Sequence, residues 1–180
     1  MIKIDYLFSI AVYYSFAQFL PNSYFPGIGR FSKWLRYICV KRIFKKCGNN
    51  VNVERRVNFG SGKNVEIGNN SGLGAYCICP SSLIVGDDVM MGPNVHIFSV
   101  NHNFQRIDIP MNQQGISEEK KVVIGNDVWI GAHCIILPGR VIKEGSIVAA
   151  GTVLTKDFNE YSIIGGNPGV LLKNRRNDTI

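Results

Sequence analysis

Hydrophobic residues recur every six positions over most of the chain. From residue 67 to residue 97, and again from residue 124 to residue 154, every sixth residue is apolar. Six is three times the side-chain period of a β-strand, so these residues face one way in an extended chain. In an α-helix they would point all round the surface, which argues against a helix. The marked positions are Ile67, Leu73, Cys79, Val85, Met91, Ile97, Ile124, Ile130, Ile136, Ile142, Val148 and Leu154.

Glycine adds a second, longer period of 18 residues. From Ile67 to Ile136 it directly follows two of every three marked residues, as at Gly68 and Gly74, and it is absent after Cys79. A glycine at a sharp bend indicates a backbone conformation that other residues resist. Three short strands per coil, joined by tight bends, would form a triangular prism with the marked residues along its axis. The repeat therefore predicts a mainly β fold, a parallel β-helix, which begins with an imperfect coil at Val53 and Phe59.

The repeat is interrupted once. After Ile97 the next marked residue is expected at position 103, but it appears at Ile124, so about 21 residues are inserted. We expect residues 98–123 to form a loop that is extruded from one corner of the prism. A histidine, His102, lies near the start of this loop, in the segment SVNHNF.

Residues 1–48 differ in character from the repeat. Residues 6–20 are apolar and aromatic, but they are fewer than the ~20 that a membrane-spanning helix needs. No small-residue cleavage site clearly follows them, so a signal peptide is not expected. After a Pro/Gly break at 20–29, the residues Phe31, Trp34, Leu35 and Ile38 recur at helical spacing. Both a helix at a membrane surface and a pair of helices capping the main domain fit this pattern, and the two interpretations are compatible.

The positive charge of the chain is concentrated in one segment. The formal net charge is +7, and residues 30–46 contain seven Lys or Arg and no acidic residue. The rest of the chain balances 13 basic against 13 acidic residues, so a nucleic-acid partner is not expected. The five cysteines form no CxxC pair, which favours reduced thiols in a cytoplasmic protein. The basic segment would hold such a protein peripherally at the inner membrane.

We therefore divide the chain into three regions. Residues 1–48 form a helical, basic and amphipathic segment. Residues 49–160 form the β-helix, including the extruded loop 98–123. Residues 161–180 form a C-terminal cap and tail.

Two longer motifs carry a family resemblance. The stretch that begins IGNDVWIGAHCIILPG and ends VAAGTVLTKDFNEYSIIGGNPGVLLK resembles the hexapeptide-repeat acetyltransferases, whose fold is a left-handed parallel β-helix. Within that family, residues 50–173 look like sugar O-acetyltransferases of the galactoside, maltose and nodulation type, and like capsule or exopolysaccharide acetyltransferases. The resemblance implies acetyl-CoA as co-substrate and a homotrimer with three active sites between subunits.

The resemblance assigns a catalytic base to the extruded loop. His102 matches the family's catalytic histidine, and Asn101 beside it would meet the acceptor. A neutral imidazole suits proton abstraction near neutral pH, because a hydroxyl is a poor nucleophile. The backbone N–H of Ala132 would stabilise the oxyanion. The other histidines, His96 and His133, are expected to face solvent or a subunit interface.

The resemblance also assigns residues to the binding of the co-substrate and of the acceptor. Trp129 would lie along the pantetheine arm, and Ala132 and Ala150 would offer it backbone groups. Thr155 and Lys156 would lie near the adenosine, with Lys173 near the phosphates. At the acceptor, the family usually has asparagines where this chain has Gly74 and Tyr76. This departure favours a different or larger glycan over a small galactoside or maltose, with Tyr76 as a stacking surface.

Other functions remain open from the sequence. The acceptor expected from the resemblance is a hydroxyl of a capsule, exopolysaccharide or lipopolysaccharide precursor. The enzymatic alternatives are N-acetylation of an amino-sugar nucleotide and acetylation of a xenobiotic or of serine. A γ-carbonic-anhydrase-like zinc protein would need three converging histidines. The chain has only three histidines, without the close pair of that family, so no metal is expected. A non-catalytic scaffold is the last alternative.

Overall fold

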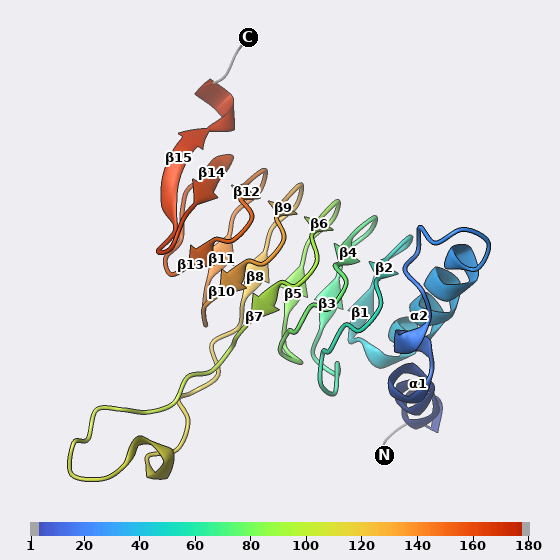
Figure 1. The fold of residues 1–180 in the computed structure, drawn as a ribbon, viewed down its shortest axis with the longest axis horizontal. Helices are drawn as coiled ribbons and strands as arrows, with labels where there is room; N and C mark the ends of the chain where they lie inside the picture. The colour runs from blue at the N-terminus through green and yellow to red at the C-terminus, as the bar shows by residue number, and fades with distance from the viewer. Residues whose placement is uncertain (1–3, 178–180) are drawn as a thin grey trace.

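The computed structural model describes residues 4–177 and shows a prism of stacked coils with two helices at its N-terminal end (Figure 1). The fold class expected from the repeat is confirmed: it is mainly β, a parallel β-helix with a helical N-terminal segment and one extruded loop. The helical segments are α1 (Ile4–Ser15), η1 (Ala17–Phe19), α2 (Gly29–Ile43), η2 (Met111–Gln113) and η3 (Arg175–Asn177).

Three faces of parallel strands form the prism. Face 1 contains β1 (Lys46–Cys47), β3 (Glu66–Ile67), β5 (Ile84–Val85), β8 (Val123–Ile124) and β11 (Val141–Ile142). Face 2 contains β2 (Asn52–Val53), β4 (Gly72–Leu73), β6 (Met90–Met91), β9 (Trp129–Ile130), β12 (Ile147–Val148), β14 (Ser162–Gly165) and the antiparallel β15 (Val170–Asn174). Face 3 contains β7 (His96–Ile97), β10 (Ile135–Ile136) and β13 (Val153–Leu154).

The strand register places the marked residues in columns along the axis. Ile67 pairs with Val85, and on face 3 Ile136 pairs with both Ile97 and Leu154. All the marked residues are buried except Met91, which is half-buried and lines a pocket described below. The period-six prediction of the core is therefore confirmed. Burial of these aliphatic side chains supplies the main stabilisation of the prism.

The repeated glycines have a different cause from the one that the sequence suggested. Gly74 does not have a positive φ; a Cβ built on it would lie 1.9 Å from the carbonyl oxygen of Gly92 in the next coil. Positive φ angles occur instead two residues later, as at Tyr76 (φ 60°) and His133 (φ 59°). The interpretation of these glycines as conformationally special residues was therefore wrong. They are required because neighbouring coils bring their backbones together at the corners.

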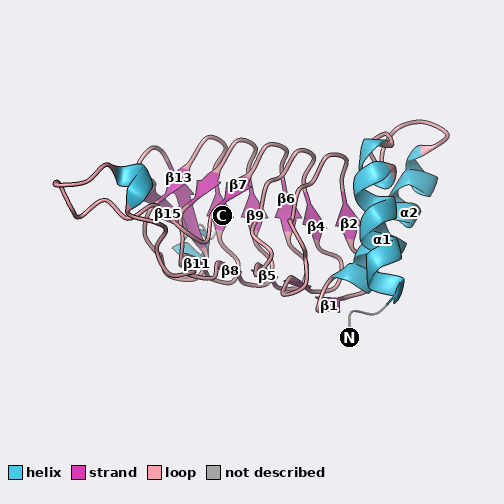
Figure 2. Cartoon of the chain, turned by 90° about the horizontal axis from the view of Figure 1, so that it is seen from below, coloured by secondary structure: helices cyan, strands magenta, loops and turns pink. Residues whose placement is uncertain are grey.

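The two helices cover the open end of the first coil (Figure 2). Tyr13 of α1 and Val40 of α2 have no exposed surface, and they belong to the same core as Val53 of the first coil. The capping interpretation of the N-terminal segment is therefore confirmed. Within residues 4–177, no helix is both long enough and apolar enough to cross a membrane.

The prism extends past both of the expected boundaries. Lys46 in β1 already pairs with Glu66, so the first strand begins three residues before position 49. At the other end, β14 continues face 2 beyond residue 160 and pairs with β12. The inserted loop leaves after β7 and returns before β8, and it projects away from the prism (Figure 1).

Candidate functional site

The base of the extruded loop holds the backbone of His102. Residues 101–103 run antiparallel to residues 115–117, with an isolated bridge between His102 and Ile116. The N–H of Ser117 donates to the carbonyl of Asn101 at 2.8 Å, and the N–H of Asn101 donates to Oγ of Ser117 at 2.9 Å. The side chains of Asn101 and His102 are exposed. The imidazole is therefore presented to the outside from a braced segment of backbone.

A carboxylate fixes the point where the loop leaves the prism. Oε1 of Glu119 accepts hydrogen bonds from Oγ of Ser82 at 2.5 Å and from Oγ of Ser99 at 3.1 Å. The N–H of Lys120 donates to the carbonyl of Ser99 at 2.7 Å. These bonds join the two ends of the loop to the preceding coil, so the direction of the loop is set by the prism.

The outer part of the loop carries apolar side chains that pack on little of this chain. Ile107 is fully exposed, and Phe104 and Met111 are each more than half exposed. Gln114 holds the loop together from within, because its side-chain amide donates to the carbonyl of Arg106 at 2.7 Å. A loop that is ordered by its own hydrogen bonds and is apolar outside is suited to contact another molecule.

The predicted co-substrate residues lie along two edges of face 3. Ala132 and Ala150 occupy successive coils at the corner between faces 2 and 3, where the N–H of Gly151 donates to the carbonyl of Ala132 at 2.9 Å. A Cβ on Gly131 would lie 2.5 Å from the nitrogen of Ala150. Ala150 is exposed. This corner is therefore lined by closely stacked backbone with small side chains, which lets a ligand approach it.

Trp129 stands on the neighbouring face 2. Its backbone pairs with Met90 of β6 and Ile147 of β12, and its side chain is 50% exposed. An indole held on a rigid strand with one free side offers a flat apolar surface to an elongated ligand.

Thr155 and Lys156 lie at the opposite edge of face 3, directly after β13. Lys156 lines a cavity of about 470 Å³ together with Lys143. The Nζ atom of Lys156 lies 5.5 Å from the centre of the Phe158 ring. Lys173 is in β15, opposite Ile163, and its strand neighbours Leu171 and Asn174 line the same cavity. Lys143 and Lys156 thus place two amino groups around this cavity, and Lys173 lies beside it without lining it.

Two of the three predicted acceptor residues, Gly74 and Tyr76, lie at the corner between faces 2 and 3, nearer the N-terminal end, whereas Asn101 lies in the extruded loop. Gly74 lines a pocket of about 390 Å³. Tyr76 lies just beyond that pocket, 44% exposed, with the guanidinium of Arg55 5.6 Å from the centre of its ring. Within one chain, Gly74 and His102 therefore lie at different corners of the prism, because the loop that carries His102 leaves at the corner between faces 3 and 1.

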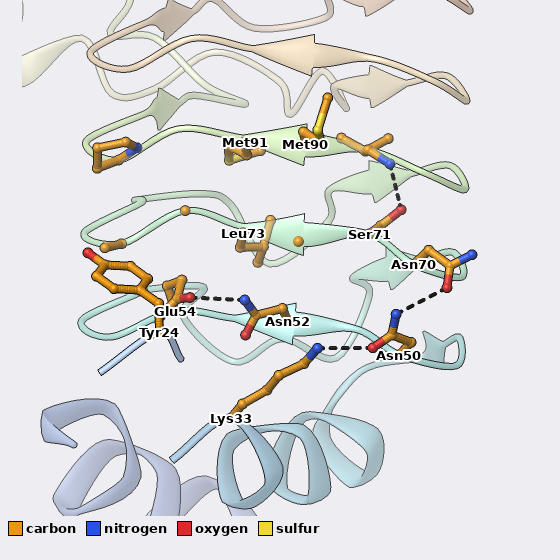
Figure 3. Close-up of a pocket in the computed structure, with 15 residues that line it drawn as sticks. Tyr24, Lys33, Asn50, Asn52, Glu54, Asn70, Ser71, Leu73, Met90 and Met91 are labelled. Atoms are coloured by element: carbon orange, nitrogen blue, oxygen red, sulfur yellow. Dashed lines mark hydrogen bonds between the residues drawn. The ribbon is translucent and has the colours of Figure 1, made fainter. Parts of the chain in front are cut away.

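The pocket itself brings together residues that the sequence did not single out (Figure 3). Glu54 lies in its wall, and its carboxylate accepts from Nδ2 of Asn52 at 2.9 Å and from the N–H and hydroxyl of Ser23. The Nζ atom of Lys33 donates to Oδ1 of Asn50 at 2.9 Å. A positive charge, a negative charge and several side-chain amides therefore line one concave surface together with Met90.

Part of this pocket, the strand of residues 50–54, could have been found from the sequence. In residues 50–54 polar residues alternate with two valines, as expected for one outward face of a strand. Tyr24 and Lys33 come from the helical region, and only the fold brings them beside that strand. Within residues 4–177, no group of three His, Cys, Asp or Glu side chains is placed to hold a metal ion.

Comparisons with known proteins agree with this geometry. The family described as "Bacterial transferase hexapeptide (six repeats)" matches residues 121–156. The chain is 31% identical to galactoside O-acetyltransferase of Escherichia coli over 72% of this chain, and it spans 63% of that relative's length. It is 33% identical to galactoside O-acetyltransferase of Lactococcus lactis over 78% of this chain and 67% of the relative.

A solved structure extends the likeness to three dimensions. A galactoside acetyltransferase in complex with coenzyme A is similar with a TM-score of 0.77 and 27% identity, over 94% of this chain and 80% of that one. The fold and its repeat are those of the left-handed β-helix acyltransferases. The chain belongs to the hexapeptide-repeat acetyltransferases.

Proposed function

We propose that this chain is an acetyl-CoA-dependent O-acetyltransferase that transfers an acetyl group to a hydroxyl of a glycan. The observation that carries the proposal is His102, presented on the loop that interrupts a hexapeptide repeat of sugar O-acetyltransferase type. The relatives are named for galactoside acetylation, and a similar structure holds coenzyme A. These likenesses support the class of donor and acceptor.

The proposed reaction is a direct transfer. The imidazole of His102 takes the proton of the acceptor hydroxyl as its oxygen attacks the thioester carbonyl carbon. The N–H of Ala132 stabilises the oxyanion of the tetrahedral intermediate. The carbon–sulfur bond then breaks, and the imidazolium returns the proton to the leaving thiolate. The acetyl ester and coenzyme A are the products, and no covalent intermediate on the protein is needed.

Two subunits would complete each site. Within a single chain, the loop that carries His102 leaves the prism at a different corner from the pocket beside Gly74. The loop also exposes Phe104, Ile107 and Met111. A second copy packed against the prism would cover these side chains and bring the imidazole to the neighbour's pocket. Repetition of this contact around a threefold axis gives a closed homotrimer with three equivalent sites.

The pocket supports a sugar acceptor. Lys33, Asn50 and Glu54 offer donors and acceptors around about 390 Å³, a volume within the usual range of small-ligand sites. The ring of Tyr24, which lines the same pocket, can stack on the apolar face of a sugar. Because Gly74 and Tyr76 replace the family's asparagines, we propose a precursor of capsule, exopolysaccharide or lipopolysaccharide as the acceptor.

The proposal is tested by thiol release from acetyl-CoA in the presence of a panel of acceptors. The panel should contain oligosaccharides, free galactosides and an amino-sugar nucleotide. We expect acceptor-dependent release by the wild type and a loss of roughly 100- to 10,000-fold in His102→Ala. Equal rates for the two proteins would contradict the role of the imidazole. Acetylation of the amino-sugar nucleotide alone would replace the O-acetyltransferase assignment with N-acetylation.

A further inference from the structure

The outward side of the helical cap is unusually apolar. On α1, Phe8 is 70% exposed and Ile4 is 83% exposed, although Tyr13 on the opposite side of the helix is fully buried. On α2, Phe31 and Trp34 are about half exposed, with ring centres 5.7 Å apart. The prism is covered by the buried side of these helices, so these side chains have no role in closing it.

The same side of α2 carries positive charge. Arg30 lies in the first turn of the helix, Lys41 and Arg42 lie in its last turn, and all three are exposed. At 100° per residue these three side chains and those of Phe31, Trp34 and Ile38 fall on one outward arc. Arg42 also lines a groove of about 360 Å³ between α1 and α2, together with Phe8, Leu35 and Ile38. Basic and apolar groups therefore share one surface, which we call the cap face.

Negative charge is nearly absent from this region. Asp5 is the sole acidic residue before Glu54, and Glu54 lies inward against Arg36. A protein partner or a second copy of the chain would have to bring several carboxylates to match the cap face. A membrane with anionic headgroups supplies matching charge for the cations and an apolar layer for the aromatic rings.

We propose that the cap face binds the surface of an anionic phospholipid bilayer. Phe8, Phe31 and Trp34 enter the boundary between headgroups and acyl chains, and Arg30, Lys41 and Arg42 meet the phosphates. Tryptophan and arginine suit this position, because each has an apolar body and a polar end. The helices lie on the membrane and do not cross it.

The cap face is continuous with the pocket of Figure 3. Lys33 and Asn50 line that pocket, and both also line a hollow of about 270 Å³ beside Trp34. A bilayer at the cap face would therefore lie next to the pocket. In an extension that rests on the proposed function, the acceptor is a glycan attached to a membrane lipid.

Vesicle co-sedimentation tests the cap face independently of catalysis. The full chain is mixed with vesicles of phosphatidylcholine alone, or of phosphatidylcholine with phosphatidylglycerol. We expect binding to the second kind, weakened by added salt. Arg30→Gln/Lys41→Gln/Arg42→Gln should bind on the order of 100-fold more weakly. The matched control, Lys120→Gln/Lys121→Gln/Arg176→Gln, removes the same charge from exposed positions away from α1 and α2 and should bind like the wild type.

A spectroscopic measurement avoids any dependence on the folding of the cap-face variants. In a Trp129→Phe background the sole tryptophan is Trp34, and its emission should shift to shorter wavelength with phosphatidylglycerol vesicles. No shift together with no co-sedimentation would overturn the proposal, as would equal weakening by the control variant. Light scattering tests whether a second copy of the chain covers the cap face instead. A lower oligomeric mass in Phe31→Ser/Trp34→Ser would assign the face to contact between copies and would also overturn the membrane proposal.

Discussion

The guanidinium of Arg36 lies 3.5 Å from the carboxylate of Glu54, and this pair joins the helical cap to the wall of the pocket. Arg36 has no exposed surface, and its Nε donates to the carbonyl of Val53 at 2.6 Å. Burial lowers the pKa of Arg36, and the charge of Glu54 opposes that change. The arginine therefore fixes α2 against the first coil, and it positions one of the pocket's charged groups.

Removal of this arginine should strongly destabilise the protein. Arg36→Met leaves Glu54 without its cation and the carbonyls of Pro21 and Val53 without a donor. We expect a loss of about 3 kcal/mol in the free energy of unfolding, measured by urea denaturation. Arg30→Met, at an exposed position of the same helix, is the control and should cost less than about 0.5 kcal/mol. Equal stability of the two variants would contradict a structural role for Arg36.

The cysteine thiols should be protected from alkylation. Burial raises the pKa of the Cys47 thiol from its ordinary value of 9.0 to about 11, and burial also raises the pKa of Cys39 and Cys134. Because the thiolate is the reactive form, iodoacetamide at pH 8 should label the native protein slowly. Mass spectrometry should find all five cysteines labelled after denaturation in urea. Rapid native labelling of Cys39 would contradict its burial.

The same shift predicts how stability depends on pH. Cys47 holds its proton more tightly in the folded chain than in the unfolded chain, so its contribution is fully present below pH 9. That contribution is lost as the pH rises through the window from 9 to about 11. Cys47→Ala should show a shallower fall of unfolding free energy across this window in urea titrations. An unchanged slope would show that other groups control alkaline unfolding.

A corner glycine far from the pocket tests the stacking of the coils. A Cβ on Gly68 would lie 2.6 Å from the carbonyl carbon of Gly86. Gly68→Ala should therefore cost about 1–3 kcal/mol, because backbone atoms must shift. Gly27→Ala provides a comparison in which the φ of +78° is strained but the Cβ has open space, and it should cost about 1 kcal/mol. Thermal melts of Gly68→Ala that match the wild type would contradict the close approach.

Trp129 should contribute to donor binding. Trp129→Ala removes an exposed indole beside the Ala132 corner, and we expect roughly a tenfold higher KM for acetyl-CoA. Phe19→Ala is the control, because Phe19 is a similarly exposed aromatic residue in the helical cap under the guanidinium of Arg56. Its KM for acetyl-CoA should match that of the wild type. A change in KM for the acceptor alone would move Trp129 to the acceptor side of the site.

The core along the axis of the prism could be predicted from the sequence, because an apolar residue at every sixth position of an extended chain always points to the same side. Met91 is the exception, since the pocket opens beside it. The burial of Arg36 could not be predicted, because it depends on the carbonyls of Leu20, Pro21 and Val53, which only the tertiary fold brings together. The same holds for Tyr24 and Lys33 in the pocket. The repeat therefore predicts where each of its residues lies along the prism. The irregular N-terminal region determines which further side chains line the pocket.

The most direct test of the shared site is activity in mixed oligomers. His102→Ala removes the base, and Met90→Trp fills the pocket without removing a hydrogen bond; each variant alone should be strongly impaired. When the two chains are co-expressed in equal amounts, one in four interfaces pairs an intact loop with an intact pocket, so thiol release should return to about a quarter of the wild-type rate. No recovery in oligomers shown to contain both chains would contradict a site that is built from two subunits.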